Sequence, residues 1–307
     1  MFRRILIANR GEIAVRVIRA CQELGIEAVA IYSDADKNAL HVQLADLTYR
    51  VGPADATESY LNKEAVLEAA IKTQSEAIHP GYGFLSEDAD FAEMVTKAGI
   101  VWIGPMAETL RLVGDKDAAR AAMAPSGIPM SKGSAPLEDN EMALAAAKEV
   151  GYPVILKPVS GGGGKGMFVA HSEEDLKNIL QLVDLKKVVH YFEHYIEHSR
   201  HIEAQILADN YGTVLFLGER ECSLQRRNQK LLEESPSIAL TEEMRREIGR
   251  LAIKAAKSVH YSNAGTVEFL LDLADNKFYF MEINPRVQVE HAITEAVTGV
   301  DIVRRQI

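Results

Sequence analysis

The sequence contains little cysteine, since Cys21 and Cys222 are the only two in 307 residues. Two cysteines so far apart offer neither the spacing of a zinc site nor a disulfide framework. Long apolar runs are also missing. None approaches the roughly eighteen residues of a membrane helix, and the short run near the N-terminus is too short for a signal peptide. We therefore expect a soluble protein of a reducing, cytoplasmic setting.

An excess of positive charge is missing too. The chain has 34 Lys and Arg against 44 Asp and Glu, which gives a net charge of −10. A broad nucleic-acid surface needs a basic stripe, so the composition argues against that partner. The hydrophobic content of 47% and the charged content of 25% are ordinary for a globular protein. The length favours two or three domains.

The first hundred or so residues alternate apolar strand patterns with amphipathic helix patterns. Strands are predicted at 3–8, 27–32, 76–79 and 100–104, and helices at 11–25, 63–73 and 88–99. This rhythm predicts a parallel sheet with crossover helices. Polar turns at Asn9 and His79 follow two of these strands, at the edge where such sheets bind ligands.

From residue 152 onwards the strands no longer alternate regularly with helices. Strands are predicted at 153–159, 167–170, 201–209, 213–221, 266–273 and 277–284, and helices at 172–183 and 241–259. This order predicts an α+β half with an antiparallel sheet. A stretch rich in Pro, Gly and Ser at 126–140 predicts a domain entrance.

A glycine loop, KPVSGGGGKGM, starts at Lys157. A strand pattern follows it, which excludes the dinucleotide fingerprint, and Gly166 follows Lys165, which excludes a Walker A loop. A hairpin with a glycine tip remains. Such a tip lets backbone N–H groups approach a ligand and lets the loop open and close. A flexible surface turn is the alternative.

The segment FYFMEINPRVQVEH, which starts at Phe278, is polar at every even position from Glu282 to Glu290. A hairpin centred near Asp275 would place Glu282 opposite Glu268, whereas a two-residue turn would need a bulge to restore that pairing. Facing carboxylates repel by roughly 3–4 kcal/mol unless one is protonated or a cation joins them. With Asn284 they offer oxygen ligands suited to Mg²⁺ or Mn²⁺. A solvent-facing hairpin without a site is the alternative.

The alternation beyond Asn284 is too long for one small site, so we expect a bend near Pro285. Arg286 lies between two acids in this sequence pattern. It is either a salt-bridged strut or a planar fork that grips a carbonate-like or phosphate anion.

Long motifs follow one another along the whole chain: ANRGEIAVRVIRACQELGI, HPGYGFLSE, GDK, ILKPVSGGGGKGM, RHIEAQILAD, GERECSLQRRNQKLLEESPS, AGTVEFL and MEINPRVQVEHAITEAVTGVD. Together they resemble the biotin carboxylase component of biotin-dependent carboxylases, which include the acetyl-CoA, propionyl-CoA and pyruvate carboxylases. The resemblance implies an ATP-grasp fold. It divides the chain into an α/β domain at 1–112, a helical connector at 113–128, a lid at 129–197 and a catalytic domain at 198–307.

The resemblance also implies an activity. ATP would phosphorylate bicarbonate to carboxyphosphate, with Mg²⁺ or Mn²⁺ as cofactor. Carboxyphosphate would release CO₂ beside biotin, which a biotin carboxyl carrier protein or domain would present. Carboxyltransferase subunits would be further partners, and the family is usually dimeric. No nucleic acid or membrane is implied.

Site residues are implied by the same resemblance. The metal ligands would be Glu268, Glu282 and Asn284. The bicarbonate site would use Lys230, Arg286, Gln288 and Val289, with Glu290 as the base. The nucleotide would contact Lys116, Lys157, Gly163, Gly164, Glu193, His194, Tyr195, Ile196, His201 and Gln225.

Three departures from the family pattern stand out. His194 replaces the usual lysine, and a histidine there would be a weaker, pH-dependent donor to the nucleotide. The lid is shorter than usual. The sequence ends at Ile307, before the family pattern does, so one hypothesis is a fragment that binds ATP but does not complete biotin carboxylation.

Three alternative interpretations remain at this stage. One is another bicarbonate-activating ATP-grasp ligase, and a second is a non-catalytic nucleotide-binding module. The third is a zinc site at His190, His194 and His198, which would require these residues to lie on a helix.

Overall fold

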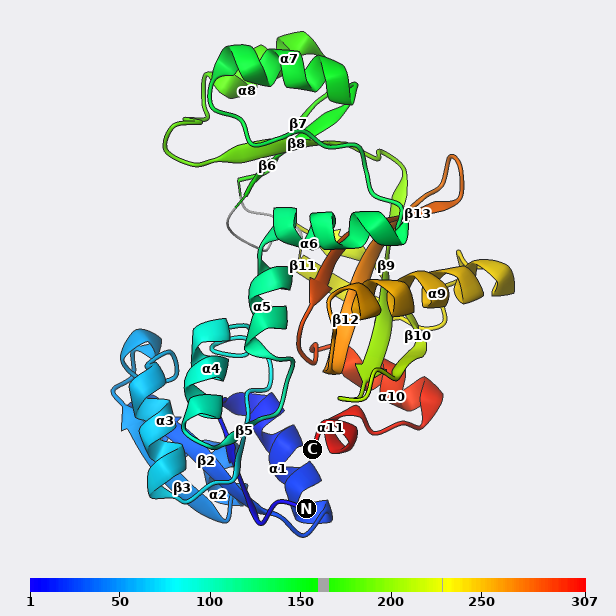
Figure 1. The fold of residues 1–307 in the computed structure, drawn as a ribbon. Helices are drawn as coiled ribbons and strands as arrows, with labels where there is room; N and C mark the ends of the chain where they lie inside the picture. Colours follow the sequence, from blue (N-terminus) through cyan, green and yellow to red (C-terminus); the bar gives the residue numbers. More distant parts are fainter. Residues whose placement is uncertain (160–165, 228) are drawn as a thin grey trace.

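The computed structural model describes residues 1–159, 166–227 and 229–307. In these residues the strands form three sheets, which lie in three separate parts of the molecule (Figure 1). The N-terminal sheet lies at the bottom left, a small sheet at the top and a second five-stranded sheet on the right. No described helix is both long and apolar enough to cross a membrane.

The N-terminal sheet has the order β3-β2-β1-β4-β5, and all its neighbouring strands are parallel. Its strands are β1 (Arg4–Ile7), β2 (Glu27–Ser33), β3 (Leu47–Gly52), β4 (Ala77–His79) and β5 (Val101–Trp102). The accompanying helices are α1 (Gly11–Glu23), α2 (Leu40–Leu44), α3 (Lys63–Lys72) and α4 (Ala89–Lys97). The predicted parallel sheet is confirmed, while the edge strand β3 was not predicted.

Local sequence explains why α1 forms and packs as it does. Ile13, Val17, Ile18 and Cys21 recur at helical spacing and are all buried against the sheet. The chain turns away just after the helix at Gly25, whose φ of +71° costs glycine little conformational energy. The helix is therefore fixed at the carboxyl end of β1, beside the turn that starts at Asn9.

The small sheet at the top is antiparallel, with the order β7-β6-β8. Its strands are β6 (Val154–Pro158), β7 (Phe168–Ala170) and β8 (His190–His194), and its helices are α7 (Asn140–Val150) and α8 (Glu173–Leu180). The pairing of β6 with β7 confirms the predicted strand, loop and strand. The zinc alternative is wrong, because His190 and His194 lie on a strand and not on a helix.

Two helices, α5 (Ala107–Gly114) and α6 (Lys116–Met123), lie between the N-terminal sheet and the other two parts (Figure 1). Asp115 caps α6, because its carboxylate accepts hydrogen bonds from the backbone N–H groups of Asp117 and Ala118. The division of the chain into domains at 112, 128 and 197 stays a prediction.

The second five-stranded sheet has the order β11-β10-β9-β12-β13 and is antiparallel throughout. Its strands are β9 (Ser199–Ala208), β10 (Val214–Arg226), β11 (Gln229–Glu234), β12 (Asn263–Asp272) and β13 (Lys277–Asn284). The helix α9 (Glu242–Ser258) packs on one face over an apolar core that includes Ile206, Phe269 and Phe280. The short helices α10 (His291–Thr298) and α11 (Ile302–Gln306) end the chain.

Gly265 on β12 leaves no room for a side chain. A Cβ there would lie 2.1 Å from the hydroxyl oxygen of Tyr261, a buried group that donates a hydrogen bond of 2.9 Å to the carbonyl of Ala264. We expect Gly265→Ala to lower the free energy of unfolding by about 2 kcal/mol, because overpacking forces this neighbour to move. Urea denaturation measures the change. Gly114→Ala is the matched control, since its Cβ would meet no atom within 4 Å; equal losses in both variants would contradict the prediction.

Candidate active site

A row of charged residues crosses the face of the second sheet opposite α9. Adjacent strands place Arg220 beside Glu203, Glu203 beside Glu268, and Glu268 beside Glu282. Three carboxylates therefore stand next to one another across β9, β12 and β13. Such an arrangement is destabilising unless positive charge lies among the acids.

A bulge produces the last of these pairings. Phe269 faces Phe280, but the next residue, Glu268, faces Glu282, so Met281 is the extra residue on β13. The predicted facing of Glu268 and Glu282 is confirmed, through a bulge that compensates for the turn register.

Arg220 lies at one end of the row and has no solvent exposure. It donates to both Glu203 and Gln288, at 3.0 and 2.8 Å. Further bonds reach the side chains of Gln205, Thr266 and Thr294. Its guanidinium therefore joins the sheet to the segment after β13 and to α10.

Lys230 on β11 brings positive charge to two acids of the row, Glu203 and Glu268, and to Glu290. Its ammonium contacts Glu203 and lies 3.3 Å from Glu268 and 2.6 Å from Glu290. Burial would lower the pKa of this lysine, but the three carboxylates hold it well above its usual value. Lys230 is therefore a permanent positive charge among three acids.

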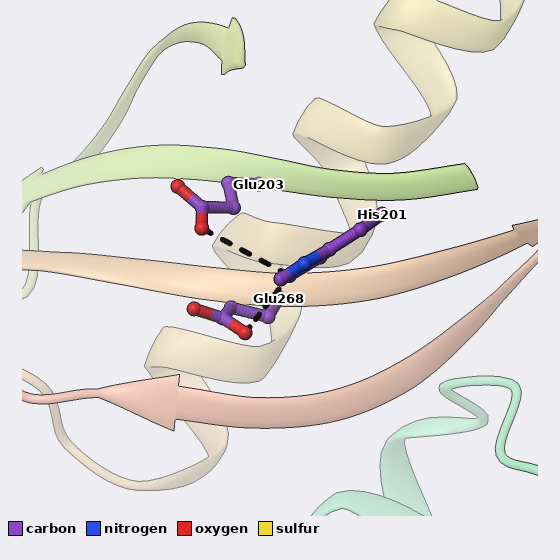
Figure 2. A group of neighbouring side chains, drawn as sticks. All are labelled: His201, Glu203 and Glu268. Carbon is purple, nitrogen blue, oxygen red and sulfur yellow. Dashed lines mark hydrogen bonds and ion pairs between the residues drawn. The ribbon is translucent and has the colours of Figure 1, made fainter. Parts of the chain in front are cut away.

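His201 approaches Glu268 from β9, with Nε2 2.9 Å from Oε2, while Glu203 lies further away at 3.9 Å (Figure 2). The other ring nitrogen of His201 is 2.8 Å from the amide nitrogen of Gln225. Burial lowers the pKa of His201, but the hydrogen bond with Glu268 raises it to above the ordinary value. The two predicted nucleotide contacts, His201 and Gln225, thus lie together beside a predicted metal ligand.

The acids of the row differ in their ionisation. Burial raises the pKa of Glu268, yet the bond from His201 and the charge of Lys230 hold it well below its usual range. Burial and the charge of Glu268 raise the pKa of Glu282. Among the described residues, no hydrogen bond to the Glu282 carboxylate is found. The Glu268–Glu282 pair is therefore the part of the row where a cation is most needed.

Asn284, the third predicted metal ligand, lies at the end of β13. Its amide nitrogen is 2.6 Å from Oε1 of Glu268, and its side-chain oxygen is 3.2 Å from the guanidinium of Arg286. The two acids and this amide could hold a divalent cation through oxygen atoms. The structure brings all three predicted ligands together at one end of the row.

The predicted bend comes directly after Asn284, where β13 ends. Gln288 is buried and donates to Oε1 of Glu268 at 3.0 Å, whereas Val289 is mostly exposed. Glu290 lies just before α10. Burial raises the pKa of Glu290, but the Lys230 ammonium lowers it to below the ordinary value, so this carboxylate is ionised at neutral pH.

Arg286 takes the form of the salt-bridged strut in this structure. Its Nε lies 2.5 Å from Oε1 of Glu87, in the loop after β4. In the alternative prediction, the two terminal nitrogens of Arg286 form a fork that grips an anion. Among the described residues these nitrogens make only long contacts with neutral oxygens, at 3.2 Å to Asn284 and 3.4 Å to the carbonyl of Val287.

The small sheet contributes a second buried carboxylate site. Glu193 on β8 lies 3.0 Å from the Lys157 ammonium, and Ser131 and Tyr191 donate to it at 2.7 and 3.0 Å. Burial raises the pKa of Glu193, but Lys157 holds it below the usual value. Burial and the charge of Glu268 raise the pKa of Glu282, and the charges of Lys116 and Lys157 offset only part of that rise.

The structure gives His194 a different partner from the one expected. Its Nδ1 lies 3.0 Å from the carbonyl oxygen of Gly151, and strand alternation places the ring on the opposite face from Glu193. The imidazole is thus hydrogen-bonded at the end of α7, and a contact of this side chain with a nucleotide stays a prediction. The neighbouring predicted contacts differ in their surroundings: the backbone N–H of Tyr195 donates to Pro153, and Ile196 is buried. Gly163 and Gly164 lie outside the described residues.

Sequence reasoning missed Glu203, Arg220 and Glu87. A signal for Glu203 existed, because His201, Glu203 and Gln205 are polar at alternate positions of β9, with the apolar Ile202 and Ala204 between them. Glu87 gave no such signal, since its contact with Arg286 joins residues 199 positions apart.

Comparisons with known proteins agree along the whole chain. Residues 1–110 match the family model described as "Biotin carboxylase, N-terminal domain", and residues 115–307 match "Carbamoyl-phosphate synthase L chain, ATP binding domain". Biotin carboxylase 1 of Bacillus subtilis is 52% identical over 100% of this chain and 70% of that protein. The biotin carboxylase of Allochromatium vinosum is 53% identical over the same shares.

Solved structures give the same result. The crystal structure of a biotin carboxylase–beta-gamma-ATP complex from Campylobacter jejuni has a TM-score of 0.94 and 46% identity, over 100% of this chain and 70% of that one. The biotin carboxylase domain dimer of the Hydrogenobacter thermophilus 2-oxoglutarate carboxylase, in complex with MgADP, ADP and bicarbonate, has a TM-score of 0.93 and 47% identity, over 100% and 69%.

Proposed function

The chain belongs to the biotin carboxylase family, and from this membership we propose that it catalyses the ATP- and bicarbonate-dependent carboxylation of biotin. It is accordingly a ligase of the ATP-grasp fold. The observation that carries the proposal is the row Glu203, Glu268 and Glu282, in which adjacent strands place carboxylates side by side. Paired carboxylates suit a divalent ion that also binds a triphosphate.

The residues present fit Mg²⁺ or Mn²⁺. Glu268 and Glu282 face each other, and burial and the charge of Glu268 raise the pKa of Glu282. Together with Asn284 they would hold the ion. When bound, the ion supplies charge neutralisation for the phosphates and for both carboxylates.

The nucleotide is proposed to lie between the small sheet and the carboxylate row. Lys116 and Lys157 would bind phosphate oxygens, with backbone amides of Gly163 and Gly164 above them. The segment from Glu193 through His194 and Tyr195 to Ile196 would contact adenine. His201 and Gln225 would complete the nucleotide site.

The bicarbonate site is proposed at the segment after β13, with Lys230, Arg286, Gln288 and Val289 around the anion. Glu290 accepts the bicarbonate proton, a bicarbonate oxygen attacks the γ-phosphorus, and the bond to ADP breaks. The product, carboxyphosphate, breaks down to CO₂ and phosphate beside biotin; the ureido nitrogen of biotin passes its proton to that phosphate and takes up the CO₂. Glu290 suits this role because it is ionised at neutral pH.

The proposed partners follow from the relatives of this chain. One of these relatives is the methylcrotonoyl-CoA carboxylase subunit alpha of rice, which is 48% identical over 99% of this chain and 42% of that subunit. Biotin on a carboxyl carrier protein or domain is the proposed substrate, and carboxyltransferase subunits are the proposed later partners. Dimer formation and a cytoplasmic location are further parts of the proposal.

One family description names carbamoyl-phosphate synthase, which would suggest another bicarbonate-activating ligase. The match of residues 1–110 to the biotin carboxylase N-terminal domain favours the biotin branch. The deciding experiment is bicarbonate-dependent ATP hydrolysis with and without free biotin, followed by incorporation of labelled bicarbonate into biotin.

Glu290→Gln tests the proposed base. The amide keeps the size and a hydrogen bond to Lys230 but cannot take a proton, so we expect bicarbonate-dependent ATP hydrolysis to fall about 100-fold or more. ATP binding, measured by calorimetry, should stay unchanged. Glu247→Gln on the exposed side of α9 is the matched control. A Glu290→Gln protein with more than a tenth of wild-type activity would remove Glu290 from this role.

A further inference from the structure

Glu87 reaches the proposed bicarbonate site from the N-terminal part of the chain, and none of the assignments above gives it a role. It lies in the loop between β4 and α4, and its carboxylate accepts a hydrogen bond of 2.5 Å from Nε of Arg286. The side chain of Glu87 is 49% exposed and that of Arg286 is 22% exposed. The pair therefore joins the N-terminal sheet to the segment that follows β13.

The loop that carries Glu87 is firmly held. The residue before it, Ser86, is buried. The residue after it, Asp88, caps α4 through a 2.8 Å bond from the N–H of Phe91 and pairs with Lys63 at 2.7 Å. Glu87 is thus presented to Arg286 from a fixed support and not from a loose loop.

The contact leaves the terminal fork of Arg286 available. A guanidinium is planar, so a partner at Nε fixes the plane in which both terminal nitrogens lie. Among the residues that the structure describes, those nitrogens make only the long contacts with Asn284 and Val287. They keep most of their capacity for an anion, which prefers two parallel N–H donors.

We infer that Glu87 is a positioning residue that orients the Arg286 fork toward bicarbonate, an inference that rests on the proposed function. Glu87 holds Nε, and the anion is received by the two terminal nitrogens. The affinity for bicarbonate then depends on the N-terminal sheet, which supplies none of the proposed bicarbonate ligands.

The kinetic test compares Glu87→Ala with Glu87→Gln. The alanine removes the acceptor, so we expect the KM for bicarbonate in ATP hydrolysis to rise about fivefold, the upper range for a partly exposed pair. Values of kcat and of the KM for ATP should stay within twofold. Glutamine keeps an oxygen for Nε, so its KM for bicarbonate should stay within twofold of wild type. Glu64→Gln, an exposed carboxylate on α3, is the charge-matched control.

Two kinetic outcomes would overturn the inference. A KM for bicarbonate that is unchanged or lowered in Glu87→Ala would mean that the pair does not assist the anion. An increase in Glu87→Gln as large as in Glu87→Ala would assign the effect to charge and not to positioning.

A second measurement does not depend on turnover. Modification of the unliganded protein with phenylglyoxal, mapped by mass spectrometry, reports how well Arg286 is held. We expect Glu87→Ala to raise the modification rate of Arg286 about threefold, and Glu87→Gln to raise it less. An unchanged rate in Glu87→Ala overturns the inference. A wild-type chain without bicarbonate-dependent ATP hydrolysis would instead refute the proposed function, while the modification rate would still decide whether Glu87 holds Arg286.

Discussion

Glu282→Gln is expected to abolish bicarbonate-dependent ATP hydrolysis and, at the same time, to make the ligand-free protein more stable. The two effects have one cause, because Glu282 is a half-buried carboxylate opposite Glu268 with no hydrogen bond among the described residues. Removing its charge relieves the repulsion between the strands, which we expect to raise the free energy of unfolding by about 1 kcal/mol. Losing a metal ligand should lower kcat/KM by about 1,000-fold, since metal neutralisation is worth several kcal/mol.

The pH dependence of this gain in stability has a definite sign. Burial and Glu268 raise the pKa of Glu282 in the folded state, so its charged form is disfavoured there relative to the unfolded chain. The penalty on the wild type is complete above that raised pKa, shrinks between it and the unfolded pKa, and is absent below the unfolded pKa. The advantage of Glu282→Gln should be largest at neutral pH and should vanish as the pH falls and Glu282 becomes protonated in both states.

Urea denaturation measures the change in stability, and its repetition with Mn²⁺ measures how much the bound ion stabilises each protein. Bicarbonate-dependent ATP hydrolysis measures the loss of activity. The wild type should gain stability from the ion through preferential binding to the folded state, and the variant should gain little. Glu247→Gln serves again as a control for the loss of one charge. A variant that keeps a tenth of the activity, or that is less stable than wild type in the absence of metal, would refute the proposed metal pair.

Lys230→Met is expected to be strongly destabilising as well as inactive. The ammonium is the shared partner of Glu203, Glu268 and Glu290. Its removal leaves Glu290 without an ion pair among the described residues and takes one of the positive partners from Glu203 and from Glu268. Breaking such a buried pair costs about 3–5 kcal/mol. Bicarbonate-dependent ATP hydrolysis should fall by about 100-fold or more, because a preorganised cation at the proposed anion site is lost.

The destabilisation should depend on pH. Burial raises the pKa of Glu290, but Lys230 depresses it, so this group stabilises the folded wild type above its unfolded pKa of about 4.3. That contribution disappears as the pH falls through the depressed folded pKa. The unfolding free energies of variant and wild type should therefore differ most near pH 7 and converge in acid.

Lys254→Met on the exposed face of α9 is the matched control, because it removes the same charge away from the carboxylate row. It should leave stability within about 0.5 kcal/mol of wild type. An equal and pH-independent loss in both variants would show that Lys230 is an ordinary surface lysine.

The sequence predicted the elements whose apolar residues are buried at a regular period. The strands β1 and β4 are runs of buried aliphatic residues, and α1 buries one stripe. The edge strands β3 and β11 escaped prediction because most of their residues are exposed or only half-buried. The helix α7 escaped because it directly follows the Pro-, Gly- and Ser-rich stretch.

In the site, too, local features could be predicted from the sequence and contacts between distant segments could not. The facing of Glu268 and Glu282 follows from alternation within one hairpin, which is a local property. The neighbours that set their ionisation, His201 and Lys230, come from other strands, and only the family resemblance marked them. The contact between Glu87 and Arg286 depends on how two sheets meet, which no local pattern encodes.

The hydrogen bonds of Arg220 join the sheet to the segment that is proposed to bind bicarbonate. With no exposure to water, its guanidinium bonds to Glu203 on β9, to Gln288 beyond β13 and to Thr294 on α10. The peptide that would receive the anion is therefore immobilised when the chain folds, before any substrate arrives. Ordering that peptide then adds little entropic penalty to substrate capture, so weak contacts with a three-oxygen anion can suffice.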